Sequence, residues 1–203
     1  MIKIIGTTHL MKKEEIINII KKENPDVIAV ELCETRYNLM VLPKLNNQKV
    51  ENSKSESDTL IGKISQSIKN KADKEGIEYG SDQINSCLFA IENKIPLEFV
   101  DLDIMKTKEL MEKIPNNEKE GFIKELMEFE SKTLEESTKD IDVENTLKEM
   151  KTKFPIAFEF LINMRNIVII NNILKIKIKY PDKKILVILG KGHVKIIEDN
   201  IND

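Results

Sequence analysis

The residues best suited to chemistry in this chain lie in two short glycine-containing segments, one near each end of the sequence. The chain has only two histidines, His9 and His193, and each stands three residues after a glycine, Gly6 or Gly190. Histidine binds metal ions and transfers protons near neutral pH, so a matched pair indicates a shared site. The alternative is that each histidine only completes a local hydrogen bond, and the repeated spacing makes this less favoured than it is for a lone histidine.

Each histidine segment follows an apolar run that predicts a buried strand. Residues 2–5 precede the first segment, and residues 185–189 precede the second. A short aliphatic run that stops at glycine is typical of a buried strand, and a histidine three residues later lies at the carboxyl end of that strand. Ligands of open α/β sheets bind at this edge, so two such segments on neighbouring strands would bring the imidazoles together.

Two more apolar runs, residues 27–32 and 97–100, predict strands that end in carboxylates. Glu31 lies near the end of the first run, and Asp101 and Asp103 follow the second. A carboxylate at the end of a buried strand needs a partner, which a metal ion or an arginine would provide. The alternative is that Glu31 and Asp103 only cap the helices that follow them.

The order of these runs predicts an α/β fold with a central, mostly parallel sheet flanked by helices. Residues 12–23 carry a helical apolar stripe between the first two strands, and strand–helix–strand order predicts a right-handed crossover and a parallel pair. Residues 154–180 carry a longer stripe before the last strand. We expect a single domain over 1–203, with a mobile loop near 46–57 and a helical insertion near 115–150, between strands three and four.

The composition restricts the partners that we expect. The 203 residues carry a net charge of −3, and only Arg36 and Arg165 among the 32 Lys and Arg residues are arginines, so nothing favours a nucleic acid. The longest apolar runs are too short to span a bilayer, and the first strand begins where a secretory signal would lie. Cys33 and Cys87 lack metal-type or redox-type spacing, so an intracellular, cytoplasmic protein is the simplest expectation. The oligomeric state stays open.

The two arginines are themselves candidate site residues. In a chain so rich in lysine, an arginine that tolerates replacement would tend to become lysine, so Arg36 and Arg165 are unusual. Arginine offers a planar fork for carboxylates that lysine cannot copy, and such a fork would anchor a substrate carboxylate or stabilise an oxyanion. The alternative is that neither arginine has a special role.

The strand-end residues together match the ligand types of a metal site with two histidines and one carboxylate. His9, Glu31 and His193 are the expected ligands, and Asp101 or Asp103 would be a fourth ligand or would orient the others. An open position would make a bound water nucleophilic, with Glu31 as ligand or general base. The spacing does not distinguish Mn, Co and Zn.

These motifs, in this order, resemble the TraB/PrgY family, within the wider superfamily that includes the TIKI metallopeptidases. That family has Gly-Thr-x-His, then Pro-Asp-x-Val-x-Val-Glu-Leu-Cys-x-x-Arg, and finally Val-x-Gly-x-Gly-His-Val. Residues 6–9, 25–36 and 188–194 resemble these motifs, and the last segment includes Gly192. Gly80-Ser81-Asp82 and Asp101-Leu102-Asp103 are also similar. The resemblance implies an α/β fold with a metal-dependent, peptidase-like site, which in some members is related to the shutdown of peptide pheromones.

Two departures from the family pattern keep a second hypothesis open. Leu102 stands where the family has arginine, and Met164 stands where it has glutamate. The leading hypothesis is a metal-dependent hydrolase that acts on peptides. The missing glutamate favours the alternative, a non-catalytic protein that sequesters a peptide or other ligand on the same fold. A third hypothesis, Cys33 as a thiol nucleophile, lacks a recognisable nucleophile elbow around that residue.

Overall fold

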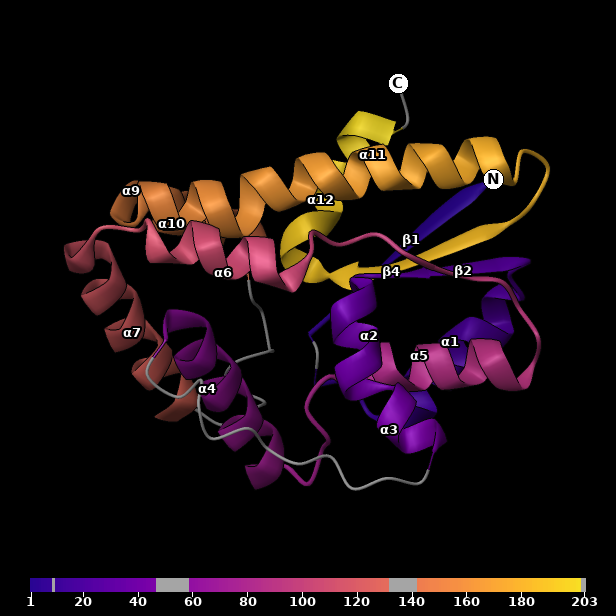
Figure 1. Ribbon diagram of the computed structural model, residues 1–203, viewed down its shortest axis with the longest axis horizontal. Helices are drawn as coiled ribbons and strands as arrows, with labels where there is room; N and C mark the ends of the chain where they lie inside the picture. The colour runs from indigo at the N-terminus through magenta and orange to yellow at the C-terminus, as the bar shows by residue number, and fades with distance from the viewer. Residues whose placement is uncertain (9, 47–58, 132–141, 202–203) are drawn as a thin grey trace. The chain divides into compact units, whose positions relative to one another are not determined.

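The computed structural model describes residues 1–8, 10–46, 59–131 and 142–201, which form two compact units (Figure 1). Unit 1 combines Met1–Val50, Gly80–Ile104 and Arg165–Asp203. Unit 2 combines Glu51–Tyr79 and Met105–Met164. His9 and most of the loop expected near 46–57 lie outside the described residues.

Unit 1 contains a four-stranded, all-parallel sheet, which confirms the α/β class. The strands are β1 (Ile2–Thr7), β2 (Val27–Val30), β3 (Leu97–Phe99) and β4 (Ile185–Gly190), in the spatial order β1-β4-β2-β3. All six residues of β4 are buried, as expected for a strand in the middle of a parallel sheet that helices cover on both faces.

The position of β4 corrects the prediction that the first two strands pair. β4 lies between β1 and β2 and pairs with both, with Thr7 opposite Gly190 and Val30 opposite Ile188. A strand from late in the chain can still take the central place. The free energy gained there comes from burying its apolar side chains, and it does not depend on the position of the strand in the sequence. As a result, the carboxyl ends of β1, β4 and β2 are neighbours at one edge.

Helices cover both faces of this sheet, as the alternating side chains of β4 show. Leu186 and Ile188 belong to a core with α1 (Lys13–Glu23) and α5 (Ser81–Glu92). The other side chains, such as Val187, belong to a core with α11 (Met164–Lys179) and α12 (Lys191–Ile201). Figure 1 shows these two pairs of helices on opposite sides of the strands. The short helices α2 (Glu34–Met40) and α3 (Leu42–Leu45) follow β2.

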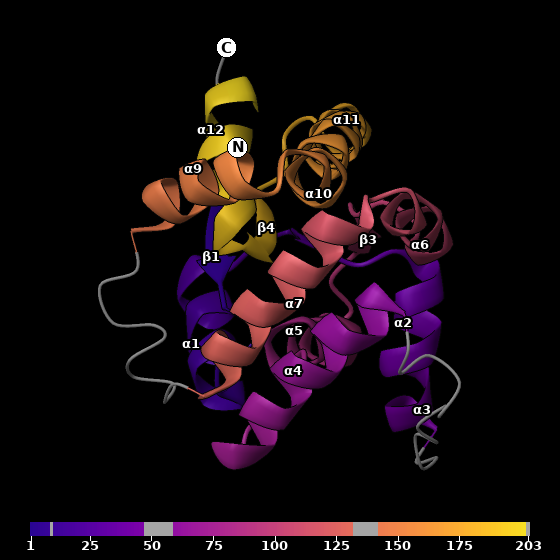
Figure 2. The same cartoon turned by 90° about the vertical axis from the view of Figure 1, so that its left-hand side faces the viewer.

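The described part of unit 2 is helical. Its helices are α4 (Leu60–Lys74), α6 (Ile104–Glu112), α7 (Asn116–Ser131), α9 (Val143–Lys153), α10 (Pro155–Phe158) and the π-helix η2 (Glu159–Asn163). Helices α4 and α7 lie side by side (Figure 2). Side chains of α4 donate to the last carbonyls of α7, from Ser67 to Leu126 at 3.4 Å and from the buried Lys71 to Phe129 at 2.7 Å. The carbonyl of Phe129 is one of the last four of α7, which a helix leaves without an intrahelical partner, and Lys71 satisfies it.

The helix expected over 154–180 is present as α10, η2 and α11 in succession. Among the described residues, only this stretch, Pro155–Lys179, is long and apolar enough by composition to cross a membrane. Ile169, Ile173 and Ile176 of the same stretch are buried in the core of unit 1, so it is not a clear membrane span.

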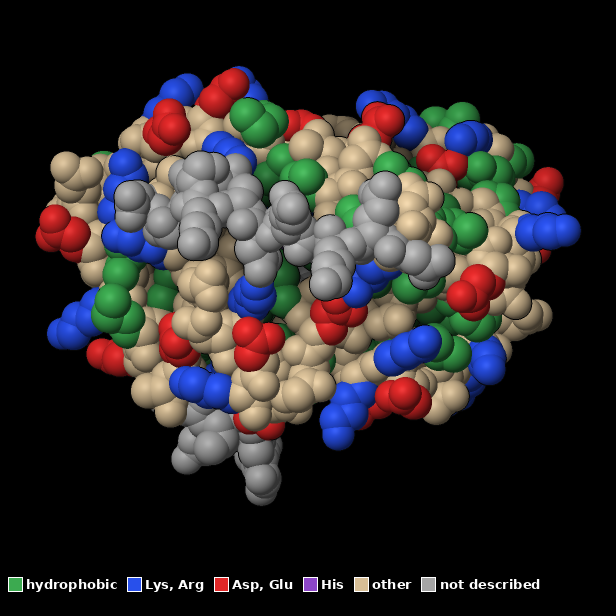
Figure 3. Space-filling model, turned by 60° about the horizontal axis from the view of Figure 1, so that its bottom comes forward, with side chains coloured by type: hydrophobic (Ala, Val, Ile, Leu, Met, Phe, Trp, Pro, Cys, Tyr) green, Lys and Arg blue, Asp and Glu red, His purple; other side chains and the backbone are tan. Residues whose placement is uncertain are grey.

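Charged side chains of both signs alternate on the surface. On the face drawn in Figure 3, Lys and Arg side chains are interspersed with Asp and Glu, and neither sign forms a continuous patch on the described residues of that face. Such a mixture is typical of a solvated surface.

Candidate functional site

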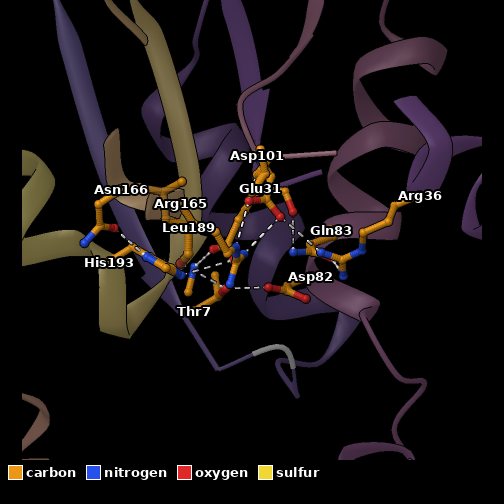
Figure 4. A network of polar contacts seen from close by, with 12 residues as sticks. Thr7, Glu31, Arg36, Asp82, Gln83, Asp101, Arg165, Asn166, Leu189 and His193 are labelled. Carbon is orange, nitrogen blue, oxygen red and sulfur yellow. Dashed lines mark hydrogen bonds and ion pairs between the residues drawn. The ribbon is translucent and has the colours of Figure 1, made fainter. Parts of the chain in front are cut away.

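A network of buried polar side chains lies at the carboxyl edge of the sheet in unit 1 (Figure 4). Its members lie at the end of β1 or follow β2, β3 and β4, because parallel strands end at the same edge. Glu31 follows β2, Asp101 follows β3, and His193 follows β4, with exposed fractions of 2%, 9% and 4%. Glu31, Asp101 and His193 therefore meet in one place, although Glu31 and His193 are 162 residues apart along the sequence.

Glu31 is held by groups from two different elements. Its Oε1 accepts a hydrogen bond from NH2 of Arg165, and its Oε2 accepts one from the backbone N–H of Gly190 at 2.5 Å. Gly190 is the last residue of β4, and α12 begins at Lys191, so the carboxylate lies at the N-terminal end of that helix. The partial positive charge of a helix N-terminus stabilises a carboxylate there.

Asp101 is bound by Arg165 through both carboxylate oxygens. Nε of Arg165 donates to Oδ1 at 2.9 Å, and NH2 donates to Oδ2 at 2.9 Å. Burial alone would lower the pKa of Arg165, but the charges and hydrogen bonds of Asp101 and Glu31 outweigh that effect and raise the pKa above its ordinary value. Arg165 therefore stays charged, and the contacts of Asp101 favour its orienting role over the ligand role.

Arg36 reaches the same network from α2. Its NH2 group donates to Oε1 of Gln83 at 3.2 Å, and its NH1 group lies 3.5 Å from Oδ2 of Asp101. Gln83 in turn donates from Nε2 to the backbone carbonyl of Glu31 at 2.9 Å. The two arginines thus approach Asp101 from different helices.

His193 lies in the first turn of α12 and not in a loop after the strand. Its Nδ1 is 2.6 Å from Oδ1 of Asn166, and its Nε2 is 3.5 Å from Oε1 of Glu31. With the amide of Asn166 oriented so that Oδ1 faces the ring, Nδ1 of the imidazole is the nitrogen that carries a proton. In the neutral ring, Nε2 then presents a lone pair toward the carboxylate of Glu31.

The remaining predicted residues lie around this network. The hydroxyl of Thr7 bonds Oδ2 of the fully buried Asp82 and lies 3.2 Å from the carbonyl of Leu189. Asp103 accepts a hydrogen bond from Thr35 at 2.9 Å, which connects the segment after β3 to the first turn of α2. A side chain at Gly6 would meet Val194 of α12 at 2.9 Å, so this glycine allows close packing of strand and helix. Gly192 lies in the first turn of α12.

Three residues of the network were not predicted as site residues, although Thr7 is the threonine of the Gly-Thr-x-His motif. Thr7, Gln83 and Asn166 are polar and at most 2% exposed. Asn166 follows Arg165 directly, and two adjacent polar residues on an apolar helix are the one signal that points to it. Only the fold shows that Thr7 bonds Asp82 and that Gln83 bonds Arg36 and Glu31.

The described residues fit a metal ion in part. Nε2 of His193 and Oε1 of Glu31 lie 3.5 Å apart, and this Oε1 also accepts from Arg165, as both oxygens of Asp101 do. No group of three His, Cys, Asp or Glu side chains in the described ranges could hold a metal ion, and His9 lies outside these ranges.

Comparisons with known proteins give no family for this chain. No family model matches the sequence, and no curated protein matches it.

Proposed function

We propose that the carboxyl edge of the sheet binds a divalent metal ion and hydrolyses peptide bonds. The observation that carries this proposal is the arrangement of Asn166, His193 and Glu31. A metal-binding histidine usually donates its other ring N–H to a carbonyl or carboxylate group, as Nδ1 of His193 does to Asn166. His9 is the third proposed ligand, because it follows β1 and the strands β1 and β4 are neighbours.

The distance between Nε2 of His193 and Oε1 of Glu31 supports this arrangement. Two acceptor atoms 3.5 Å apart repel unless a proton or a cation lies between them. Two ligand atoms bound to one ion at about 2.1 Å, with a tetrahedral angle, are about 3.4 Å apart. The pair therefore has the spacing of two ligands of one ion.

A bound metal ion would supply an acidified water molecule near neutral pH. Oε1 of Glu31 faces the proposed position, where it would either bind the ion or accept the proton of that water. Arg165 and the N–H of Gly190 hold the carboxylate of Glu31 in place, and Asn166 holds the imidazole ring. The resemblance of the terminal motifs to TraB/PrgY proteins supports a peptide as the substrate.

The second candidate function is the capture of a peptide without cleavage. One observation favours it: Arg165 binds both Glu31 and Asp101 and so neutralises part of the charge that a metal ion would need. Met164 in place of the family's glutamate points the same way.

The test replaces Glu31 by glutamine and measures peptide cleavage. A peptide library is incubated with the protein after loading with Mn, Co or Zn separately, and products are detected by mass spectrometry. We expect the wild type to cleave and Glu31→Gln to lose about a hundredfold or more of the turnover, as for a missing acid–base group. Glu34→Gln, three residues away and exposed, is the matched control. If the metal-loaded wild type cleaves nothing but retains peptides, the capture function replaces the hydrolase.

A further inference from the structure

We propose that Arg36 binds the C-terminal carboxylate of a peptide, so that the site selects peptides with a free C-terminus. This inference rests on the proposed peptide-directed function, because it names the part of the peptide that the site recognises. It concerns binding, so it holds for a hydrolase and for a capturing protein alike.

The two arginines of the network differ in how their donors are used. Arg165 donates from Nε and NH2 to both oxygens of Asp101 and also to Glu31. Arg36 has five N–H donors like any arginine. Among the described residues it makes one hydrogen bond, from NH2 to the neutral amide of Gln83.

The ion pair of Arg36 is also the weaker of the two. Its NH1 group lies 3.5 Å from Oδ2 of Asp101, and this oxygen already accepts from Arg165 at 2.9 Å. A guanidinium that is largely buried and bonded mainly to a neutral amide has donors to offer to another anion, because a buried charge is costly unless it is paired. A carboxylate fits this fork with two parallel hydrogen bonds.

Arg36 is accessible enough to meet a ligand. Its side chain is 18% exposed, whereas that of Asp101 is 4% exposed. The rest of the side chain is packed, and Gln83 fixes the guanidinium at 3.2 Å, so little conformational entropy is lost when a ligand binds. Lysine at this position would lack the planar fork.

The position of Arg36 relative to Glu31 determines which bond of a bound peptide would lie beside the proposed metal site. In Figure 4, Arg36 and His193 lie on opposite sides of Glu31. Gln83 bonds both the guanidinium of Arg36 and the backbone carbonyl of Glu31, and so it fixes the spacing between them. A peptide whose last carboxylate is on Arg36 would place a bond near its C-terminus beside Glu31 and His193. The proposed cleavage is therefore that of a residue or short segment from the C-terminal end.

The experiment uses three libraries of random hexapeptides. The first lacks Asp and Glu and ends in a free carboxylate, the second is the same library with C-terminal amides, and the third has amides and one internal Asp. Each is mixed with metal-loaded, full-length protein, and the loss of intact peptide from the ultrafiltrate is measured by mass spectrometry. The loss of intact peptide counts bound and cleaved peptides together. Cleavage is measured separately from the products, so a protein that binds without cleaving still gives a result.

We expect the wild type to deplete the first library about tenfold or more over the second, the effect of hydrogen bonds to a charged group. Arg36→Gln removes this preference, and Arg36→Lys retains the charge but most of the preference is lost. Lys22→Gln, an exposed charge removal in α1, retains it and serves as the control. The near-ultraviolet circular dichroism of Arg36→Lys confirms that the variant is folded.

Several results would overturn the inference. Equal depletion of the first two libraries, or no depletion of either, shows that the terminal carboxylate is not recognised. Equal depletion of the first and third libraries assigns recognition to acidic side chains instead of the C-terminus. A preference that survives Arg36→Gln shows that another residue binds the carboxylate.

Discussion

Arg165 binds both oxygens of Asp101, from Nε to Oδ1 and from NH2 to Oδ2, each at 2.9 Å. Asp101 follows β3, and Arg165 lies at the start of α11, so this pair fixes that helix to the carboxyl edge of the sheet. The same guanidinium bonds Glu31 after β2. One side chain thus joins three elements that meet only in the folded chain.

We predict that Arg165→Lys lowers the free energy of unfolding by about 1–3 kcal/mol, because an ammonium cannot make the side-on pair and leaves buried oxygens poorly satisfied. Urea denaturation followed by circular dichroism measures the change. The control is Lys175→Gln, which removes an exposed charge from the same helix. If the lysine variant is as stable as the control variant, the pair has no structural role.

The tautomer of His193 gives a prediction for Asn166. Asn166→Leu should weaken metal binding by about 10- to 100-fold, since the group that orients the imidazole is lost. Asn166→Asp should retain or strengthen binding, because it keeps an acceptor at Nδ1. Asn171→Ala, an exposed change in the same helix, should have no effect. Affinity is measured by isothermal titration with each metal. Weak binding by the aspartate variant would contradict the assigned tautomer.

Cys87 predicts a loss of stability at alkaline pH. Burial, and to a lesser degree the charge of Asp82, raises the pKa of this thiol from 9.0 to about 12. The thiol ionises at a lower pH in the unfolded chain than in the folded chain. The contribution of the neutral Cys87 thiol to the free energy of unfolding is therefore complete below pH 9 and is lost as the pH rises toward 12. We expect the stability advantage of the wild type over Cys87→Ala to fall by about 1.4 kcal/mol per pH unit within that window.

The measurement compares the urea denaturation of the wild type and Cys87→Ala between pH 8 and 10.5. Lysine titrations are common to both proteins and cancel in the difference. Burial raises the pKa of Tyr37 in both proteins, and the charge of Cys87 raises it further in the wild type alone, so the tyrosinate absorbance is recorded alongside. A difference that is constant over this range would show that the thiol does not titrate later in the folded state.

The hydrogen bonds of Glu118 should stabilise unit 2. This buried carboxylate accepts hydrogen bonds from the backbone N–H groups of Ile156 and Ala157, each at 3.0 Å, at the start of α10. Glu118→Ala leaves these donors unsatisfied, at a cost of about 1–3 kcal/mol. The control is Glu120→Ala, an exposed position on the same helix. Hydrogen exchange at Ile156 and Ala157 locates the effect, and unchanged protection of these amides would contradict it.

Much of the fold follows from local patterns. The aliphatic runs predicted all four strands. β2 and β4 are buried over their whole length and are apolar throughout, whereas the outer strands β1 and β3 each admit one charged residue. The helical stripes of residues 12–23 and 154–180 likewise correspond to helices. The place of β4 between β1 and β2 was not predicted, since strand order depends on packing between segments that are far apart in the sequence.

The candidate site follows from the sequence to a smaller extent. The parallel sheet explains why Glu31, Asp101 and His193 meet, and their positions at strand ends made this predictable. The partners of these residues were not predictable. Arg165 and Asn166 lie on a helix whose rotation about its axis decides which side chains face the sheet edge, and Gln83 is close to Arg36 only after both helices have packed.

Metal binding by protein purified without a histidine tag tests the central proposal most directly. Mn, Co and Zn are titrated separately into the wild type, His9→Ala, His193→Ala and the exposed control Asn200→Ala. We predict that the wild type and the control bind one ion per chain and that both histidine variants lose affinity to a similar degree. Absence of binding by the wild type, or unchanged affinity in His193→Ala, would contradict a shared metal site at this edge of the sheet.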